Sequence, residues 1–250
     1  MILVAVVPTY NEVGHLAQLA GDLLRLDLPG IDVRLLVVDD ASPDGTGRLA
    51  DELAEREPLR IKVMHRASKQ GLGSAYVDGC ACALAMGADL LAQMDGDRSH
   101  DPAALLSMVE VIRDFDVVIG SRYVFGGGVD ADWPWHRKLL SWIANRAVVP
   151  ALLALPVSDA TSGYRLWRRD ALTRIAPWAN VRSSGYGFQV EMAYLAHRHG
   201  CRIKEVPIHF REREFGRSKM SFVVKLAAVR EILAIHRQHA ASDLTAQGRS

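Results

Sequence analysis

The sequence predicts an α/β protein with a mostly parallel central sheet and helices on both faces. Short apolar runs rich in β-branched residues alternate with stretches of helical spacing through the first half of the 250 residues. Because these runs are apolar throughout, each strand should be buried on both faces, as in parallel sheets. Hydrophobic residues make up 49% of the chain, which suffices for a sizeable core and argues against disorder.

Five strands and four helices are expected before residue 122. The expected strands are ILVAVV (2–7), VRLLVVDD (33–40), RIKVMH (60–65), LLAQMD (90–95) and DVVIGS (116–121). The expected helices cover 13–26, 44–57, 72–87 and 102–113. Ligands of such sheets bind beyond the carboxyl ends of the strands.

The pattern changes after about residue 125. A glycine-rich loop, GGGVDADWPW, precedes an expected helix at 137–153, and DATSGYRLWRRDA is expected to be a polar loop that enters a helix. CRIKEVPIHF is an expected strand, followed by the charged loop REREFGRSKMS. An amphipathic helix is expected at about 218–237, with 238–250 as a frayed tail. We therefore expect one domain over residues 1–237.

Charge, cysteine content and hydropathy exclude several classes of protein. Thirty basic and 29 acidic side chains give a formal net charge of +1, so nothing in the overall charge attracts nucleic acid. Cys80, Cys82 and Cys201 are odd in number and lack zinc-ligand spacing, which indicates reduced thiols in the cytoplasm. The apolar start reads as a first strand rather than a signal peptide. The longest uncharged apolar run, 147–157, is far shorter than the roughly 20 residues that span a bilayer.

A polar segment follows each of the five expected strands. The segments are PTYNE, DDASPDGT, HRASKQGLG, DGDRSHD and SRYVFGGG. Since the carboxyl ends of parallel strands share one edge of the sheet, these segments should come together in a single site.

Asp95 and Asp97 lie one residue apart at the end of the fourth expected strand. Two such carboxylates repel each other unless a cation lies between them, and Mg²⁺ or Mn²⁺ takes oxygen ligands that it usually shares with substrate phosphates. The alternative is a helix start, because Asp101 and Pro102 open a helix and acids favour its first turn. An EF-hand is excluded because its sixth position would be His100 rather than glycine.

Asp39 and Asp40 end the second expected strand. An acid at this point can accept hydrogen bonds from a ribose or a base, as it does in dinucleotide-binding folds. The glycine fingerprint of those folds is missing, since Tyr76 stands where GLGSAY would need its third glycine. A dinucleotide cofactor is therefore not expected. Taken alone, SPDGT is more simply a turn followed by a helix cap.

The order of the motifs resembles that of the dolichol-phosphate (polyprenol-phosphate) mannose synthases, inverting glycosyltransferases of family 2 with a GT-A fold. The motifs are VVPTYNE, VVDDASPDGT, GLGSAY, MDGDRSHDP, GSRYVFGGG, DATSGYR and FGRSKMS. The resemblance covers roughly residues 1–237. It implies metal-dependent transfer of mannose from GDP-mannose to a polyprenyl monophosphate, with inversion, by a GT-A catalytic domain at the cytoplasmic face of the cell membrane.

The resemblance also implies which residues bind the donor. The nucleotide sugar would be held by Pro8, Tyr10, Glu12, Val37, Asp39, Asp95, Gly96 and Asp97. Arg213 and Lys219 would clamp its diphosphate and act in catalysis. Asp97, also catalytic, would ligate Mg²⁺ or Mn²⁺ with help from Ser99. The chain departs from the family in having Gly96 and Arg98 where Ala, then Leu or Gly, are common; Arg98 could contact a phosphate or could simply be solvated.

On the acceptor side, the resemblance places the lipid phosphate on Arg122, Arg137 and Ser141, with Arg122 also catalytic. A lipid monophosphate is largely dianionic at pH 7 and needs no strong general base, which fits the lack of a compelling His or Glu for that role. Arginine suits bidentate phosphate binding. Asp159 could position the acceptor or the sugar, or could cap its own loop.

Membrane contact is expected at the surface, without a spanning segment. Trp133 and Trp135, beside Arg137 and Lys138, could meet lipid headgroups, or the tryptophans could be packed under their loop. The apolar stripe of the 218–237 helix favours core packing, with a membrane-lying or dimerising helix as the alternative. A separate membrane-anchoring protein could also hold the enzyme at the membrane.

Two further functions stay open. The same fold could use UDP-glucose or another nucleotide sugar, or a hydroxyl acceptor, which would demand a general base. A catalytically silent nucleotide-binding protein is the third hypothesis, and the intact acids at positions 95 and 97 argue against it.

Overall fold

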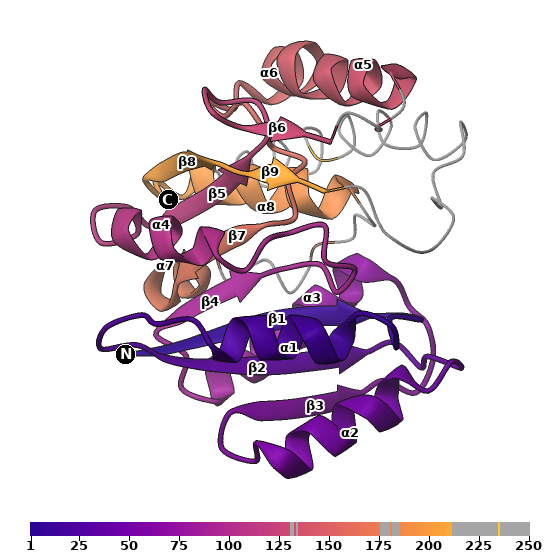
Figure 1. Ribbon diagram of the computed structural model, residues 1–250. Coiled ribbons are helices and arrows are strands. Elements are labelled where there is room, and N and C mark those ends of the chain that lie inside the picture. The colour runs from indigo at the N-terminus through magenta and orange to yellow at the C-terminus, as the bar shows by residue number, and fades with distance from the viewer. Residues whose placement is uncertain (131–132, 134, 176–180, 182–185, 212–234, 236–250) are drawn as a thin grey trace, which may run out of the picture.

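The structure, a computed structural model, describes residues 1–130, 133, 135–175, 181, 186–211 and 235 (Figure 1). The predicted phosphate clamp, Arg213 and Lys219, lies outside these residues, as do the expected tail at 238–250 and, apart from Ile235, the expected helix at 218–237. The domain boundary at residue 237 therefore stays a prediction.

A seven-stranded mixed sheet forms the centre of the protein, in the order β3-β2-β1-β4-β7-β5-β8 (Figure 1). Its strands are β1 (Ile2–Thr9), β2 (Asp32–Asp39), β3 (Ile61–His65), β4 (Leu90–Gln93), β5 (Val117–Ser121), β7 (Arg165–Arg168) and β8 (Ile203–Pro207). β7 runs antiparallel to both of its neighbours, β4 and β5, whereas the other pairs are parallel. A small second sheet pairs β6 (Gly128–Val129) with β9 (His209–Phe210).

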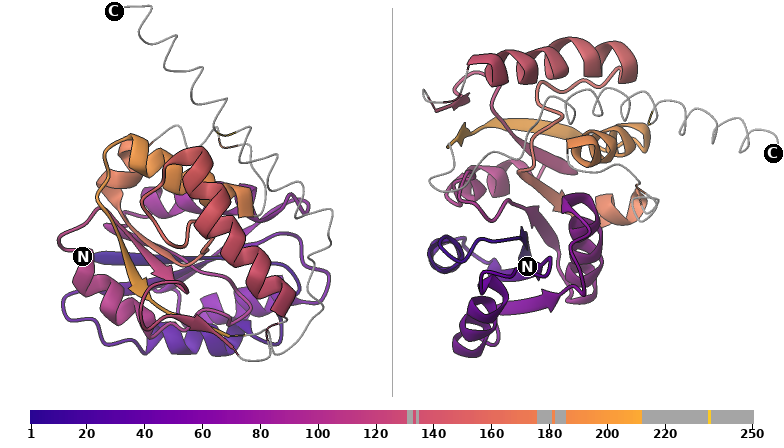
Figure 2. Two further views of the ribbon diagram at one scale, coloured as in Figure 1. Left: turned by 90° about the horizontal axis from the view of Figure 1, so that it is seen from above. Right: turned by 90° about the vertical axis from the view of Figure 1, so that its right-hand side faces the viewer.

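Helices cover both faces of the sheet (Figure 2). One face packs on α1 (Leu16–Leu24), α2 (Thr46–Arg56) and α4 (Ala104–Val111). The other packs on α3 (Leu72–Ala85), α6 (Val149–Leu153), α7 (Arg169–Arg174) and α8 (Tyr186–Arg198). β1 shows why the expected strand is apolar throughout: Val4 and Val6 point to one core and Leu3 and Ala5 to the other.

A long helical segment lies at one end of the sheet, beyond β8 (Figure 1). It consists of α5 (Trp135–Ile143), one π-helical stretch, η1 (Ala144–Val148), and α6. Among the described residues, no helix is both long enough and apolar enough to cross a bilayer.

The structure confirms the five expected strands and four expected helices of the first half, to within a few residues at their ends. It corrects the second half in two places. The segment expected to run from loop into helix contains β7, which is only four residues long and has an arginine at each end, so no strand pattern was visible. The single strand expected at 201–210 is split into β8 and β9 at Ile208, because β9 leaves the main sheet to pair with β6.

Candidate active site

The segments that follow β1 and β2 are joined at the carboxyl edge of the sheet. The Asp39 carboxylate is buried and accepts hydrogen bonds from the Thr9 hydroxyl (3.3 Å) and from the Ser42 backbone N–H (3.1 Å). The Glu12 N–H donates to the Thr46 hydroxyl at 2.9 Å. These bonds bring the predicted nucleotide-binding residues of PTYNE and DDASPDGT together.

Asp40 adds the segment after β3 to the same edge. Its buried carboxylate pairs with Arg66 at 2.6 Å and accepts the N–H groups of Gln70 and Gly71. Lys69, in this segment, places its ammonium 3.5 Å from the centre of the Tyr10 ring. Asp40 therefore positions a loop, whereas Asp39 lies beside the predicted ribose site.

The paired acids follow β4 in the middle of this edge. Asp97 is buried, and its Oδ1 accepts hydrogen bonds from the Ser99 hydroxyl (2.6 Å) and the Ser99 N–H (3.0 Å). Asp95 accepts a hydrogen bond from the Tyr76 hydroxyl at 3.2 Å. Burial, with Asp95 second, raises the pKa of Tyr76 well above its usual value, so this phenol stays a neutral donor.

Close packing against the end of β1 favours glycine at position 96. A Cβ added to Gly96 would stand 3.2 Å from the Pro8 carbonyl oxygen and 3.2 Å from the Thr9 side chain. The loop after β4 therefore packs closely on the end of β1. At the other side of the acids, a Cβ added to Gly163 would stand 3.4 Å from Oδ1 of Asp95.

The residues around the acids fit a divalent cation that is shared with a substrate. The carboxylates of Asp95 and Asp97 and the hydroxyl of Ser99 are hard oxygen donors of the kind Mg²⁺ and Mn²⁺ prefer. Within the part of the chain that the structure describes, no group of three or more His, Cys, Asp or Glu side chains could hold a metal. Phosphate oxygens of a substrate would have to complete the coordination.

His100 joins the acids to the acceptor side, a role that the sequence did not suggest. Its Nδ1 accepts a hydrogen bond from the Asp95 N–H at 3.1 Å, so the ring proton sits on Nε2. Its ring stacks on Tyr164 (4.9 Å between centroids) and meets the edge of Phe210 (5.5 Å). Burial lowers the pKa of His100; the ring is therefore neutral at pH 7.

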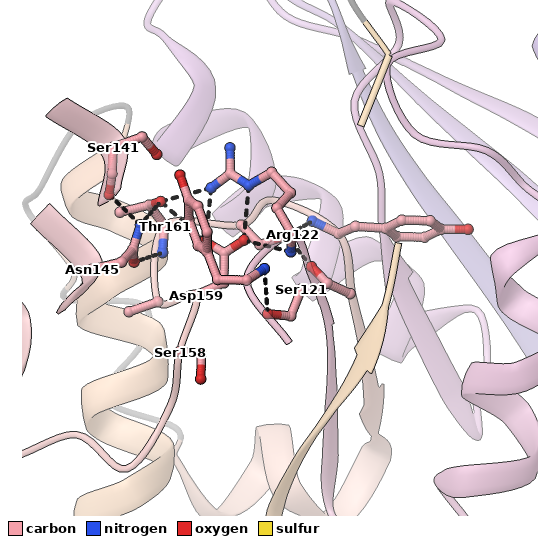
Figure 3. Close-up of polar contacts among 12 residues, drawn as sticks. Ser121, Arg122, Ser141, Asn145, Ser158, Asp159 and Thr161 are labelled. Carbon is pink, nitrogen blue, oxygen red and sulfur yellow. Dashed lines mark hydrogen bonds and ion pairs between the residues drawn. The ribbon is translucent and has the colours of Figure 1, made fainter. Parts of the chain in front are cut away.

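Arg122, directly after β5, is the centre of the predicted acceptor side (Figure 3). Its Nε and Nη2 donate to the two carboxylate oxygens of Asp159 at 2.8 and 2.7 Å, and its backbone N–H donates to the same carboxylate at 3.0 Å. Asp159 is fully buried, with 0% of its surface exposed. Its carboxylate thus orients Arg122, and it also accepts a bond from Thr161 in its own loop at 3.2 Å.

Two residues that sequence reasoning missed support this pair. Glu205 of β8 accepts the backbone N–H groups of Ser158 and Asp159 at 2.7 and 2.8 Å. Asn145 of η1 bonds to Ser141 and to Thr161 (Figure 3). Neither residue belongs to a motif, because one lies within a strand pattern and the other within a helix pattern.

Aromatic rings surround the Arg122 guanidinium. The rings of Tyr123, Trp133 and Phe210 lie 5.4, 5.9 and 5.5 Å from it. Trp133 is buried here, so of the two interpretations of the tryptophans, packing holds for Trp133. Trp135 is 75% exposed, as expected for a surface contact.

Exposed apolar side chains gather on α5, and one more, Phe125, lies between β5 and β6. These side chains are Phe125, Trp135, Leu139, Leu140, Trp142 and Ile143. We call this set the α5 surface. It lies at the end of the molecule that carries α5 and α6 (Figure 1) and adjoins the Arg122 site through the bond between Asn145 and the Ser141 carbonyl.

Most of the predicted donor residues gather at one edge, but Val37 does not contribute its side chain. Val37 is fully buried in the core of β2, so only its backbone could reach a ligand.

The guanidinium of Arg98 lies 3.9 Å from Asp22 of α1. Arg137 and Ser141, predicted on the acceptor side, both belong to α5.

The chain was compared with known proteins. The model of glycosyl transferase family 2 matches residues 4–176. An undecaprenyl-phosphate mannosyltransferase of Micrococcus luteus is 48% identical over 221 residues, which are 88% of each chain. A polyprenol monophosphomannose synthase of Mycolicibacterium smegmatis is 46% identical over 217 residues, 86% of this chain and 80% of that one.

Solved structures share the fold at low sequence identity. A mannosyltransferase of Pyrobaculum calidifontis, in complex with GDP-Man and Mn²⁺, superposes with a TM-score of 0.60 at 20% identity, covering 96% of this chain and 64% of that one. The mixed, mainly parallel sheet is thus that of the GT-A glycosyltransferases. From the family match and the close relatives, the chain belongs to glycosyl transferase family 2.

Proposed function

We propose that the protein transfers mannose from GDP-mannose to a polyprenyl monophosphate, with inversion at the sugar, and that it does so at the membrane surface. The relatives at 46–48% identity carry names of this activity. Inversion follows from direct attack by the lipid phosphate on the donor's anomeric carbon, on the face opposite the departing GDP.

The observation that carries the proposal is the adjacency of the acids and Arg122. His100 accepts the Asp95 N–H at 3.1 Å, and the edge of Phe210 packs against its ring. Phe210 contacts both the His100 ring and the Arg122 guanidinium at 5.5 Å. A donor diphosphate at the acids and an acceptor phosphate at Arg122 would therefore be neighbours, as a transfer between them requires.

The donor half would hold the nucleotide and the leaving group. Asp39 would accept hydrogen bonds from the ribose, near Tyr10 and Glu12. Asp97 and Ser99, with Asp95 nearby, would hold Mg²⁺ or Mn²⁺ against the diphosphate. Such a cation, when bound, neutralises the charge that develops on the leaving diphosphate. Arg213 and Lys219, which are not among the described residues, would add positive charge at the diphosphate.

The acceptor half would hold a phosphate that needs no deprotonation. Arg122 is fixed by Asp159 before any ligand arrives, so little side-chain entropy would be lost on binding. His100 would not act as a general base in this tautomer, because its Nδ1 accepts the Asp95 N–H and its Nε2 carries the proton, and a dianionic nucleophile needs none.

The α5 surface would rest on the membrane from which the lipid comes. Exposed Trp, Phe and Leu side chains favour the interface, and Lys138 of the same helix would meet anionic headgroups. We propose that the protein works as a peripheral enzyme at the cytoplasmic face, held by this contact or together with a membrane-anchoring partner.

The test is direct. Purified protein is incubated with Mg²⁺, a short polyprenyl phosphate, and either GDP-mannose or UDP-glucose, and the lipid is analysed by mass spectrometry. A mannosylated lipid from GDP-mannose alone is expected, and the Asp97→Ala variant should give none. A glycosylated lipid formed only from UDP-glucose would overturn GDP-mannose as the donor. Nucleotide binding without any lipid product would overturn the polyprenyl phosphate as the acceptor.

A further inference from the structure

A continuous hydrogen-bonded chain joins α5 to Arg122 (Figure 3). It runs from the Ser141 carbonyl through Asn145 and Thr161 to the Arg122 guanidinium. Ser141 and Arg122 are both predicted acceptor-phosphate residues. Ser141 belongs to α5, whereas Arg122 directly follows β5.

Asn145 anchors the helical end of this chain. It lies in η1, where the helix widens to π geometry, and is only 1% exposed. Its Nδ2 donates both to the Ser141 carbonyl (3.0 Å) and to the Thr161 hydroxyl (2.9 Å), and its Oδ1 accepts the Thr161 N–H (3.3 Å). Single π turns within helices often mark functional positions, and here the turn carries a side chain that ties the helix to a loop.

Thr161 is the junction of the chain. Its hydroxyl accepts hydrogen bonds from Asn145 (2.9 Å) and from Nη2 of Arg122 (2.8 Å), and it donates to Oδ1 of Asp159 (3.2 Å). A hydroxyl has one donor and two acceptor sites, so all three are used. A side chain of the same shape without the hydroxyl would break every one of these bonds.

The donor half has its own, separate supports. Asp39 holds Thr9 and Ser42, and Asp40 holds Arg66 and the loop after β3. Neither set includes Asn145 or Thr161. A substitution of Asn145 or Thr161 should therefore change the affinity for the acceptor and leave the affinity for the donor nucleotide unchanged.

We infer that Asn145 and Thr161 are positioning residues, which set the Arg122 guanidinium relative to α5 and so determine the affinity for the acceptor phosphate. The inference rests on the proposed function and adds to it two residues that contact Arg122 or α5 rather than the reacting atoms.

The experiment compares two substitutions of one residue. Thr161→Val keeps the shape and removes the hydroxyl, whereas Thr161→Ser keeps the hydroxyl. The Kd for farnesyl phosphate and the Kd for GDP with Mg²⁺ are measured by calorimetry, and KM and kcat are measured for the lipid. Thr173→Val is the matched control, since its hydroxyl bonds only to the Arg169 carbonyl of α7 among the described residues.

Thr161→Val should raise the Kd and KM for the lipid phosphate about tenfold, which corresponds to about 1.4 kcal/mol. The Kd for GDP should stay within about twofold. Thr161→Ser and Thr173→Val should bind the lipid like the wild type. If Thr161→Val fails to fold, Asn145→Leu makes the same comparison, because it roughly keeps the size of the side chain, removes the Nδ2 donor and adds no charge.

Unchanged lipid affinity in Thr161→Val, or equal losses for lipid and GDP, would overturn the inference. A wild-type protein that binds farnesyl phosphate but transfers no mannose would overturn only the proposed function, because the binding comparison would still test Thr161. A wild-type protein that binds no farnesyl phosphate would overturn both.

Discussion

Replacing Asp159 with alanine should destabilise the folded protein more than the same replacement of an exposed aspartate. In Asp159→Ala, Arg122 loses three hydrogen bonds and Thr161 loses one. The Arg122 side chain, only 5% exposed, would keep its charge in a buried place without its carboxylate. Breaking one partner of a buried ion pair typically costs about 3–5 kcal/mol.

The matched control is Asp170→Ala. Asp170 also pairs with an arginine, Arg168, at 3.0 Å, but the two side chains are 54% and 42% exposed. Exposed pairs contribute roughly 0–1 kcal/mol. Since each kcal/mol shifts the Tm of a protein of this size by about 2–4 °C, Asp159→Ala should lower the Tm by about 10 °C and Asp170→Ala by no more than about 4 °C.

Chemical and thermal denaturation, followed by circular dichroism, measure both variants. The double variant Arg122→Met/Asp159→Leu should recover part of the loss, because it removes the buried unpaired charge, although the backbone N–H of residue 122 and the Thr161 hydroxyl still lose their acceptor. A Tm for Asp159→Ala that matches that of Asp170→Ala would refute the reasoning, since the burial of the pair would then have no energetic consequence.

Two further substitutions and one measurement of thiol reactivity test other parts of the molecule. Asp97→Ala should abolish the Mg²⁺-dependent part of GDP-mannose binding in calorimetry; an unchanged metal dependence would remove Asp97 from the metal site. Leu139→Glu on the exposed α5 surface should weaken binding to anionic phospholipid vesicles at least several-fold and leave GDP affinity unchanged, and equal vesicle binding would contradict a membrane role. Burial raises the pKa of Cys80 to about 12, so at pH 8 only about 1 in 10,000 of these thiols is ionised; Ellman's reagent should react quickly with the partly exposed Cys82 and reach Cys80 and Cys201 only on unfolding.

The sequence predicted the donor half better than the acceptor half, for a physical reason. Predicted donor residues such as Asp39 and Asp97 lie at or just after the ends of apolar strands, so strand ends place them at one edge without further information. Val37, two residues before Asp39, has its side chain in the core, so its predicted contact with the nucleotide would have to come from its backbone.

The acceptor half depends on contacts between distant segments, which no local pattern reveals. Asp159 reaches Arg122 across 37 positions, and Glu205 reaches Asp159 across 46. β7 is too short and too rich in arginine to resemble a strand. The two tryptophans differ only in their neighbours: Trp133 meets Phe210 at 5.7 Å between ring centroids, whereas Trp135 faces outward.

The reversed direction of β7 has a consequence for how such enzymes can diversify. Gln93 at the end of β4 pairs with Arg165 at the start of β7, so the segment 158–164 enters the site from the amino end of a strand. The segment is also tied to the paired acids, because Gly163 lies close to Asp95 and the Tyr164 ring stacks on His100. A change in the length of this segment would displace both contacts, so we expect variation between related enzymes to be confined to side chains, such as Thr161, that face Arg122.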